Sequence, residues 1–175
     1  MVDFGFAKRH LTKKGYPYKE RKKLEFHGTI NYASVNAHLN RDLGRKDDLW
    51  SFFFVLLEFL NEELPWRYIS KDQVPRYKTI IIDRLNGCLF KGPTRKLAPV
   101  HEIFSHLKLL SYEDKPDYQL IRMCLSRLQR SAEGTITTCA FTDVPNQPSE
   151  THKSLLDPLP EAPPQAPVTL TTPTH

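Results

Sequence analysis

Cysteine is scarce in this chain of 175 residues. Its three cysteines, Cys88, Cys124 and Cys139, form neither an even set of partners nor a closely spaced pair of metal ligands. The sequence therefore disfavours a disulfide scaffold and a zinc site. The prediction that follows is a protein of a reducing, intracellular compartment.

Long apolar runs are missing as well. The longest one, Leu49 to Leu60, is too short to cross the roughly 30 Å hydrocarbon layer of a membrane. The first residues also lack the basic, apolar and small-residue pattern of a secretory leader. These features predict a soluble protein of the cytoplasm, with the nucleus as the alternative compartment.

Glycine is infrequent, and the seven glycines nowhere form a Gly-x-Gly-x-x-Gly pattern. The sequence therefore contains no glycine-rich phosphate loop of that type. What it does contain is typical of a globular domain, with 39% hydrophobic and 26% charged residues. One domain with a buried core is the expectation for this length.

The net charge of +5 is unevenly distributed. Between residues 8 and 27, eight basic residues stand against two acidic ones, a local balance of +6, while the rest of the chain is nearly neutral. The last 31 residues, 145–175, hold eight prolines and no aromatic residue. Such a segment cannot bury enough apolar surface to fold, so we expect a disordered tail.

Between these parts, the pattern predicts four helices and no convincing sheet. One covers Asp47 to Leu60 and is apolar almost all round, which is typical of a buried helix. A weaker one covers about Tyr77 to Leu85, after an interruption at Pro75. Two amphipathic helices follow Pro99 and Pro116, and Gly134 indicates the end of the last one.

A series of short motifs occurs in a specific order. The tripeptide Asp3-Phe4-Gly5 alone is a weak signal. It is followed by further motifs, which are Gly28-Thr29-Ile30-Asn31-Tyr32-Ala33-Ser34-Val35-Asn36-Ala37-His38, Arg45-Lys46-Asp47-Asp48-Leu49-Trp50-Ser51, Leu64-Pro65-Trp66 and Lys115-Pro116-Asp117-Tyr118.

Over about residues 1 to 130 this series resembles the casein kinase I superfamily, and most closely its tau-tubulin kinase branch. The triplet Ser34-Val35-Asn36 stands where most protein kinases have Ala-Pro-Glu. Phe53 departs from the usual Asp-x-Trp-Ser-x-Gly pattern, because it occupies the glycine position.

The resemblance implies a mainly α fold, a protein-kinase-like C-terminal lobe without the N-terminal lobe. Residues 1–140 would form this partial kinase domain and 145–175 the disordered, proline-rich tail. We also expect that Met1 is an internal methionine of a longer kinase, or that the sequence comes from a truncated gene prediction.

For the chemistry, the resemblance assigns Asp3 as the Mg²⁺ ligand beside the ATP phosphates. Thr29 would contact the catalytic aspartate, which is not in this chain. Asp48 would receive backbone hydrogen bonds from the catalytic loop, and it is equally well explained as a helix cap. Mg²⁺ and ATP are cofactors of the intact family, and we expect this fragment to bind neither tightly.

A basic group beside the activation segment, Arg21, Lys22, Lys23 and Arg45, would bind acidic or phosphorylated protein substrates. A solvated loop without a partner is the competing interpretation of such a charge run. Nucleic-acid binding is a minor alternative, because Tyr16 and Tyr18 do not show a regular spacing for stacking on bases. Trp50 and Trp66 are predicted to be packing anchors.

The function predicted from the sequence is that of a fragment of a serine/threonine protein kinase, inactive alone and monomeric. Phosphoryl transfer in this family needs a glycine-rich loop, a lysine on a strand and a catalytic base, and none of them is in the sequence. The alternative is a non-catalytic, pseudokinase-like module that binds acidic or phosphorylated proteins.

Overall fold

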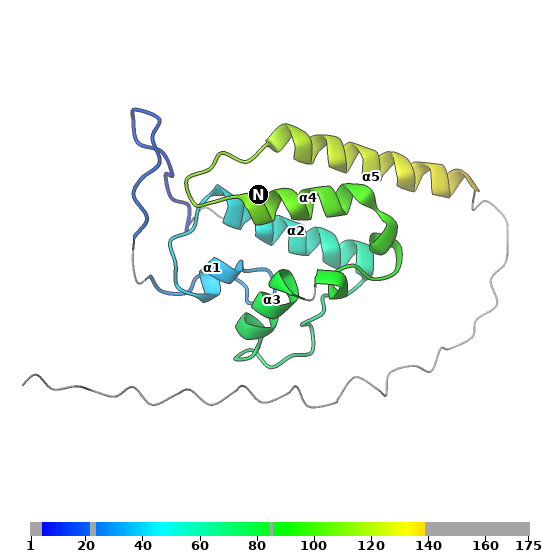
Figure 1. Cartoon of the computed structure of the whole chain (residues 1–175), viewed down its shortest axis with the longest axis horizontal. Helices are drawn as coiled ribbons and strands as arrows, with labels where there is room; N and C mark the ends of the chain where they lie inside the picture. The colour runs from blue at the N-terminus through cyan, green and yellow to red at the C-terminus, as the bar shows by residue number, and fades with distance from the viewer. Residues whose placement is uncertain (1–4, 22–23, 85, 139–175) are drawn as a thin grey trace, which may run out of the picture. The chain divides into compact units, whose positions relative to one another are not determined.

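The computed structural model describes residues 5–21, 24–84 and 86–138, with side chains up to residue 132. Over these ranges the chain is mainly helical and contains no β-strand, as the sequence predicts. The elements are α1 (Val35–His38), α2 (Arg45–Asn61), α3 (Val74–Asp83), α4 (Ala98–Leu109) and α5 (Tyr118–Thr138), with the short 3-10 helices η1 (Asn86–Cys88) and η2 (Gly92–Lys96) (Figure 1). The predicted disordered tail lies outside the described residues.

Helix α2 forms the centre of the core. Its first turn carries Asp47 and Asp48, which favour a helix N-terminus, and its buried face consists of large apolar side chains. Trp50 and Phe53 both pack against Phe104 of α4, with ring centroids 5.8 and 5.9 Å apart. Trp66 is completely buried and meets Phe54 edge-to-face. The prediction that both tryptophans are packing anchors is confirmed.

One face of α2 is not covered. Phe59 is 81% exposed and Phe52 is 38% exposed, so the prediction of a helix buried on all sides is wrong for this face. The reason is that α4 and η2 pack against α2 while no described element covers the line of Asp48, Phe52 and Phe59.

Helix α3 begins earlier than predicted. Pro75 lies in its first turn, where the missing N–H would have no helical partner anyway, and therefore starts the helix rather than interrupting it. The helix buries Val74, Lys78 and Ile81 on one face. A buried lysine on this face could not be anticipated from hydrophobic spacing.

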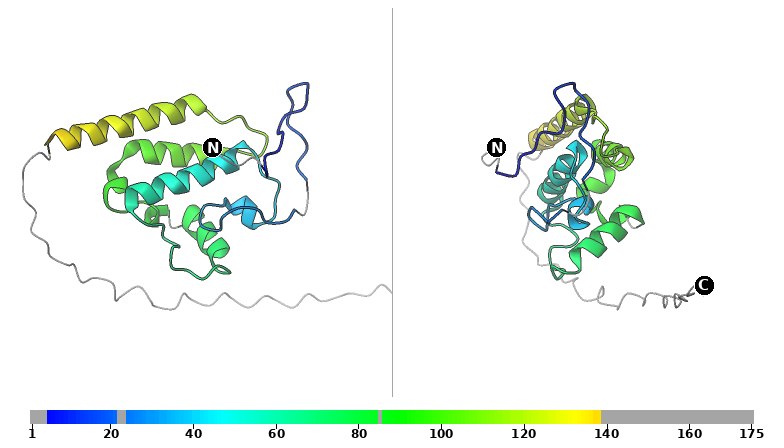
Figure 2. Two further views of the ribbon diagram at one scale, coloured as in Figure 1. Left: turned by 180° about the vertical axis from the view of Figure 1, so that it is seen from behind. Right: turned by 90° about the vertical axis from the view of Figure 1, so that its left-hand side faces the viewer.

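Helices α4 and α5 lie side by side (Figures 1 and 2). Pro99 is in the first turn of α4, and the predicted apolar face around Val100 and Phe104 is buried. Helix α5 continues past Gly134 to Thr138, so the predicted end at this glycine is wrong. A glycine costs about 1 kcal/mol inside a helix and does not by itself stop one.

Residues 10–18 form a small hairpin before the helices. Leu11 and Pro17 make an isolated antiparallel bridge, and Tyr18 N–H donates to His10 O at 2.9 Å. The turn closes through Thr12 N–H to Tyr16 O and is completed by Gly15, whose φ of 84° is favourable for glycine. The hairpin projects from the helices (Figures 1 and 2).

Candidate functional site

The family triplet is attached to the start of α2 through Asp47. This carboxylate is 2% exposed and accepts hydrogen bonds from Ser34 Oγ at 2.7 Å, Asn36 Nδ2 at 3.0 Å and Gly44 N–H at 2.8 Å. Ser34 Oγ also accepts from Ala37 N–H and so caps α1. Both polar residues of the triplet therefore fix the segment before α1 to α2.

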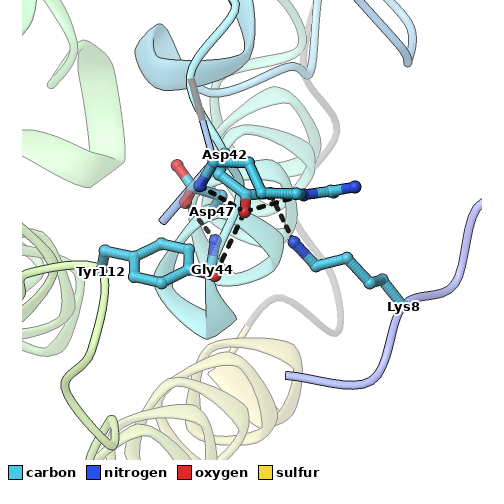
Figure 3. A network of polar contacts seen from close by, with 6 residues as sticks. Lys8, Asp42, Gly44, Asp47 and Tyr112 are labelled. Carbon is cyan, nitrogen blue, oxygen red and sulfur yellow. Dashed lines mark hydrogen bonds and ion pairs between the residues drawn. The ribbon is translucent and has the colours of Figure 1, made fainter. Parts of the chain in front are cut away.

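Gly44 lies in close contact with the loop between α4 and α5. A Cβ atom at this position would lie 2.7 Å from the carbonyl oxygen of Tyr112, closer than real Cβ contacts allow. A glycine is therefore needed for the two backbones to approach (Figure 3).

Beside this contact, Asp42 holds both ends of the basic segment (Figure 3). Lys8 Nζ, before the hairpin, donates to Asp42 Oδ1. Arg21, after the hairpin, donates from its backbone N–H at 3.1 Å and from Nε and a guanidinium NH₂ at 3.2 Å each. Tyr112 OH lies 3.4 Å from Asp42 Oδ2. A carboxylate that is 3% exposed is thus surrounded by donors from three separate segments.

The protonation of Asp42 reflects these donors. Burial alone would raise the pKa of a carboxyl group, but the hydrogen bonds from Arg21 and Lys8 hold the pKa of Asp42 well below its usual range. Asp42 is therefore ionised throughout the physiological pH range. His10 packs edge-on against the Tyr112 ring, with centroids 5.2 Å apart, and adds a ring contact at the same junction.

The lysines of the hairpin, and the lysine directly after it, are accessible. Lys13, Lys14 and Lys19 are exposed, and none of them is hydrogen-bonded or ion-paired with another described residue. Tyr16 is 69% exposed and Tyr18 is 45% exposed on the same segment. This combination can bind a chain of carboxylates or phosphates, with the tyrosines supplying contact area.

Two of the four residues assigned to the substrate anion make intramolecular contacts. Arg21 is paired with Asp42, and a guanidinium NH₂ of Arg45 donates to Glu113 O at 3.1 Å. Lys22 and Lys23 lie outside the described residues. Anion binding by these four residues remains a prediction, which these contacts do not test.

The residues assigned to catalytic support lie at the surface. Thr29 is exposed, and its carbonyl accepts from Tyr32 N–H and Ala33 N–H. Asp48 is exposed and accepts no hydrogen bond from the described residues, whereas its neighbour Asp47 accepts three. Although the side chain reaches solvent, desolvation by the neighbouring protein atoms and, secondarily, the negative charge of Asp47 raise the pKa of Asp48. Asp3, the predicted Mg²⁺ ligand, lies outside the described residues.

Asp42, Lys8 and Tyr112 could not be recognised as a group from the sequence. Lys8 lies 34 positions before Asp42 and Tyr112 lies 70 positions after it, so no local spacing connects them. The one indirect signal was the excess of cations between residues 8 and 23, which favours, without requiring, a carboxylate partner in the fold.

Within the described ranges, no group of three or more His, Cys, Asp or Glu side chains could hold a metal ion. None of the helices in these ranges has the length and apolarity needed to cross a membrane.

Comparison with known proteins gives two informative relatives. A probable serine/threonine-protein kinase of Dictyostelium discoideum is 40% identical over 130 residues, covering 72% of this chain and 24% of the relative. Casein kinase I homolog 2 of Saccharomyces cerevisiae is 31% identical over 140 residues, covering 71% of this chain and 23% of the relative. No family model matches the chain.

These similarities support a relationship with the protein kinase superfamily over about 70% of the chain. The mainly helical fold of the described residues is compatible with a kinase C-terminal lobe. The chain spans about a quarter of the length of the two relatives.

Proposed function

We propose that this chain is the activation segment and C-terminal helical lobe of a serine/threonine protein kinase of the tau-tubulin kinase type. In the longer protein, Asp3 would hold Mg²⁺ beside ATP, and the chemistry would be transfer of the terminal phosphate to a protein hydroxyl. The basic segment would select acidic or phosphorylated substrates in the cytoplasm or nucleus.

The uncovered line on α2 is the observation that carries this proposal. Phe52 lies four positions after Asp48 and Phe59 eleven positions after it, which puts all three on one face of the helix. At one end of this line, Asp48 accepts no hydrogen bond from a described residue, and two exposed phenylalanines lie beyond it. A further segment could pack on the phenylalanines and donate hydrogen bonds to Asp48. The share of the relatives left unmatched supports a longer protein that supplies this segment.

The first experiment is the mass of the native protein, detected with an antibody against residues 145–175. We expect a product well above 20.3 kDa that transfers phosphate to an acidic protein, whereas the isolated 175-residue chain should not. A native product of 20.3 kDa would contradict the proposal.

A non-catalytic binding module is the second candidate, and the ordered hairpin with its accessible lysines favours it. This function predicts that the purified chain unfolds cooperatively and binds an acidic peptide with an affinity that falls as salt is added. A chain that aggregates or does not bind at low ionic strength would exclude it.

A further inference from the structure

Asp42 connects two residues that flank the hairpin. Lys8 and Arg21 are 13 positions apart, and both bind the same carboxylate. Because that carboxylate is 3% exposed and belongs to the segment leading into α2, it cannot follow a moving loop without breaking the bonds of Figure 3. The two ends of the segment are therefore fixed to the helical core at one point.

The hydrogen bonds inside the hairpin complete this arrangement. The bridge between Leu11 and Pro17 and the bond from Tyr18 N–H to His10 O hold the two arms of the loop together. The contact of His10 with Tyr112 adds a further attachment beside Asp42. With its base and its interior both held, the backbone of the tip is presented in one orientation, which reduces the backbone conformational entropy lost on binding.

As a result, the cations of this segment fall into two groups, those paired with Asp42 and those without an acidic partner. Lys8 and Arg21 share the single negative charge of Asp42, whereas Lys13, Lys14 and Lys19 have no acidic partner among the described residues. The exposed tyrosines beside them are suited to a polypeptide ligand, because their rings offer large contact area with few rotatable bonds.

We propose that Asp42 is a positioning residue: by clamping Lys8 and Arg21 it holds the 10–18 hairpin as a docking element, with Lys13 and Lys14 as the residues that contact an acidic protein segment. This inference rests on the acidic-partner part of the proposed function. It differs from the sequence-based assignment, because the main contacts with the acidic partner come from the hairpin tip and not from Arg21.

The charge of Asp42 makes the test decisive. The substitution Asp42→Asn adds one unit of positive charge, so charge counting alone predicts tighter binding of an acidic peptide. Positioning predicts the opposite, because the hairpin loses its anchor. The probe is a fluorescent peptide of ten glutamates, titrated with the full 175-residue chain at low ionic strength.

We expect Asp42→Asn to weaken binding by about threefold to tenfold, and Asp42→Glu to restore most of the affinity. The double variant Lys13→Ala with Lys14→Ala should weaken binding by about tenfold or more. Its matched control is Lys96→Ala with Arg130→Ala, which removes two exposed charges outside the hairpin and should change affinity less than twofold, on the order of the effect of distant screened charges.

Thermal unfolding of each variant shows whether the fold survives. Should Asp42→Asn not fold, Lys8→Gln with Arg21→Gln removes the clamp from exposed side chains, and it should weaken binding more than the matched control does. Tighter binding by Asp42→Asn, or equal losses in the clamp or tip variants and the control, would overturn the inference and leave the acidic-partner function standing. Failure of the unaltered chain to bind the peptide would overturn both.

Discussion

Lys78 lies with its ammonium nitrogen 2.7 Å from the carbonyl oxygen of Ala33, although the two residues are 45 positions apart. The same nitrogen donates to Ile30 O at 2.8 Å and lies over the rings of Phe54 and Trp66, 4.7 and 4.8 Å from their centroids. Through this one side chain, α3 holds the segment before α1 against the core. Burial lowers the pKa of Lys78 to about 7.

Stability should therefore depend on the proton of Lys78. The side chain keeps its proton up to about pH 10.5 in the unfolded chain and up to about pH 7 in the folded one. Since the unfolded state binds more protons in this window, the free energy of unfolding should rise with pH from about 7 to 10.5, by at most about 1.4 kcal/mol per unit.

Denaturant unfolding at several pH values, compared between the original chain and Lys78→Met, measures this contribution. The variant should lack the rise, and the difference between the two curves removes the contributions of other groups. A difference that does not change between pH 7 and 10 would show that the folded and unfolded chains hold this proton equally.

The adjacent carboxylates of α2 should differ sharply. Asp47→Ala leaves the donors of Ser34, Asn36 and Gly44 without their acceptor, so we expect a loss of about 2 to 4 kcal/mol in the free energy of unfolding. Asp48→Ala should change it by less than about 0.5 kcal/mol, because the exposed Asp48 accepts no hydrogen bond from the described residues. Similar losses in both variants, measured by urea denaturation, would contradict the assignment of the network to Asp47.

The helices were predictable because their signals are local. The apolar face of α4 follows a 3.6-residue period, and prolines in the first turns of α3 and α4 mark their starts. The start of α3 is less predictable, because the same proline, Pro75, is compatible with a break before a helix and with its first turn. The end of α5 was misread because Gly134 carries only a weak penalty.

The site was less predictable because its contacts are distant in the sequence. Motif resemblance assigns Asp48 to the catalytic loop, which remains a prediction, but it gives no sign that the adjacent Asp47 is the buried acceptor for Ser34 and Asn36. Likewise, the basic run predicts a positive surface, while the neutralisation of Arg21 depends on the position of Asp42 in another segment. Long-range pairing of this kind leaves no periodic signal.

Gly44 should tolerate no side chain. Gly44→Ala places a methyl group against Tyr112 O, and relief of that overlap must shift one of the two backbones, at a cost of about 1 to 3 kcal/mol. Gly87→Ala is the matched control, since a Cβ there meets no atom within 4 Å. Thermal unfolding of both variants tests the contact, and an unchanged midpoint for Gly44→Ala would mean that the loop between α4 and α5 can move away freely.

Phe59 distinguishes the isolated chain from the proposed longer kinase. At 81% exposure, Phe59→Ser removes little buried area from the 175-residue chain, so its free energy of unfolding should change by less than about 0.5 kcal/mol. Phe53→Ala, on the buried face of the same helix, should cost about 3 to 5 kcal/mol in either context.

In the longer protein, a segment packed on the line of Asp48, Phe52 and Phe59 would bury the Phe59 ring. The serine substitution should then cost about 2 kcal/mol or more, because it removes a large apolar side chain from a packed interface. Unfolding measurements on both lengths of the protein provide the comparison. An equally small effect in both would mean that α2 keeps this face open to solvent, and the observation on which the kinase-lobe proposal rests would no longer support it.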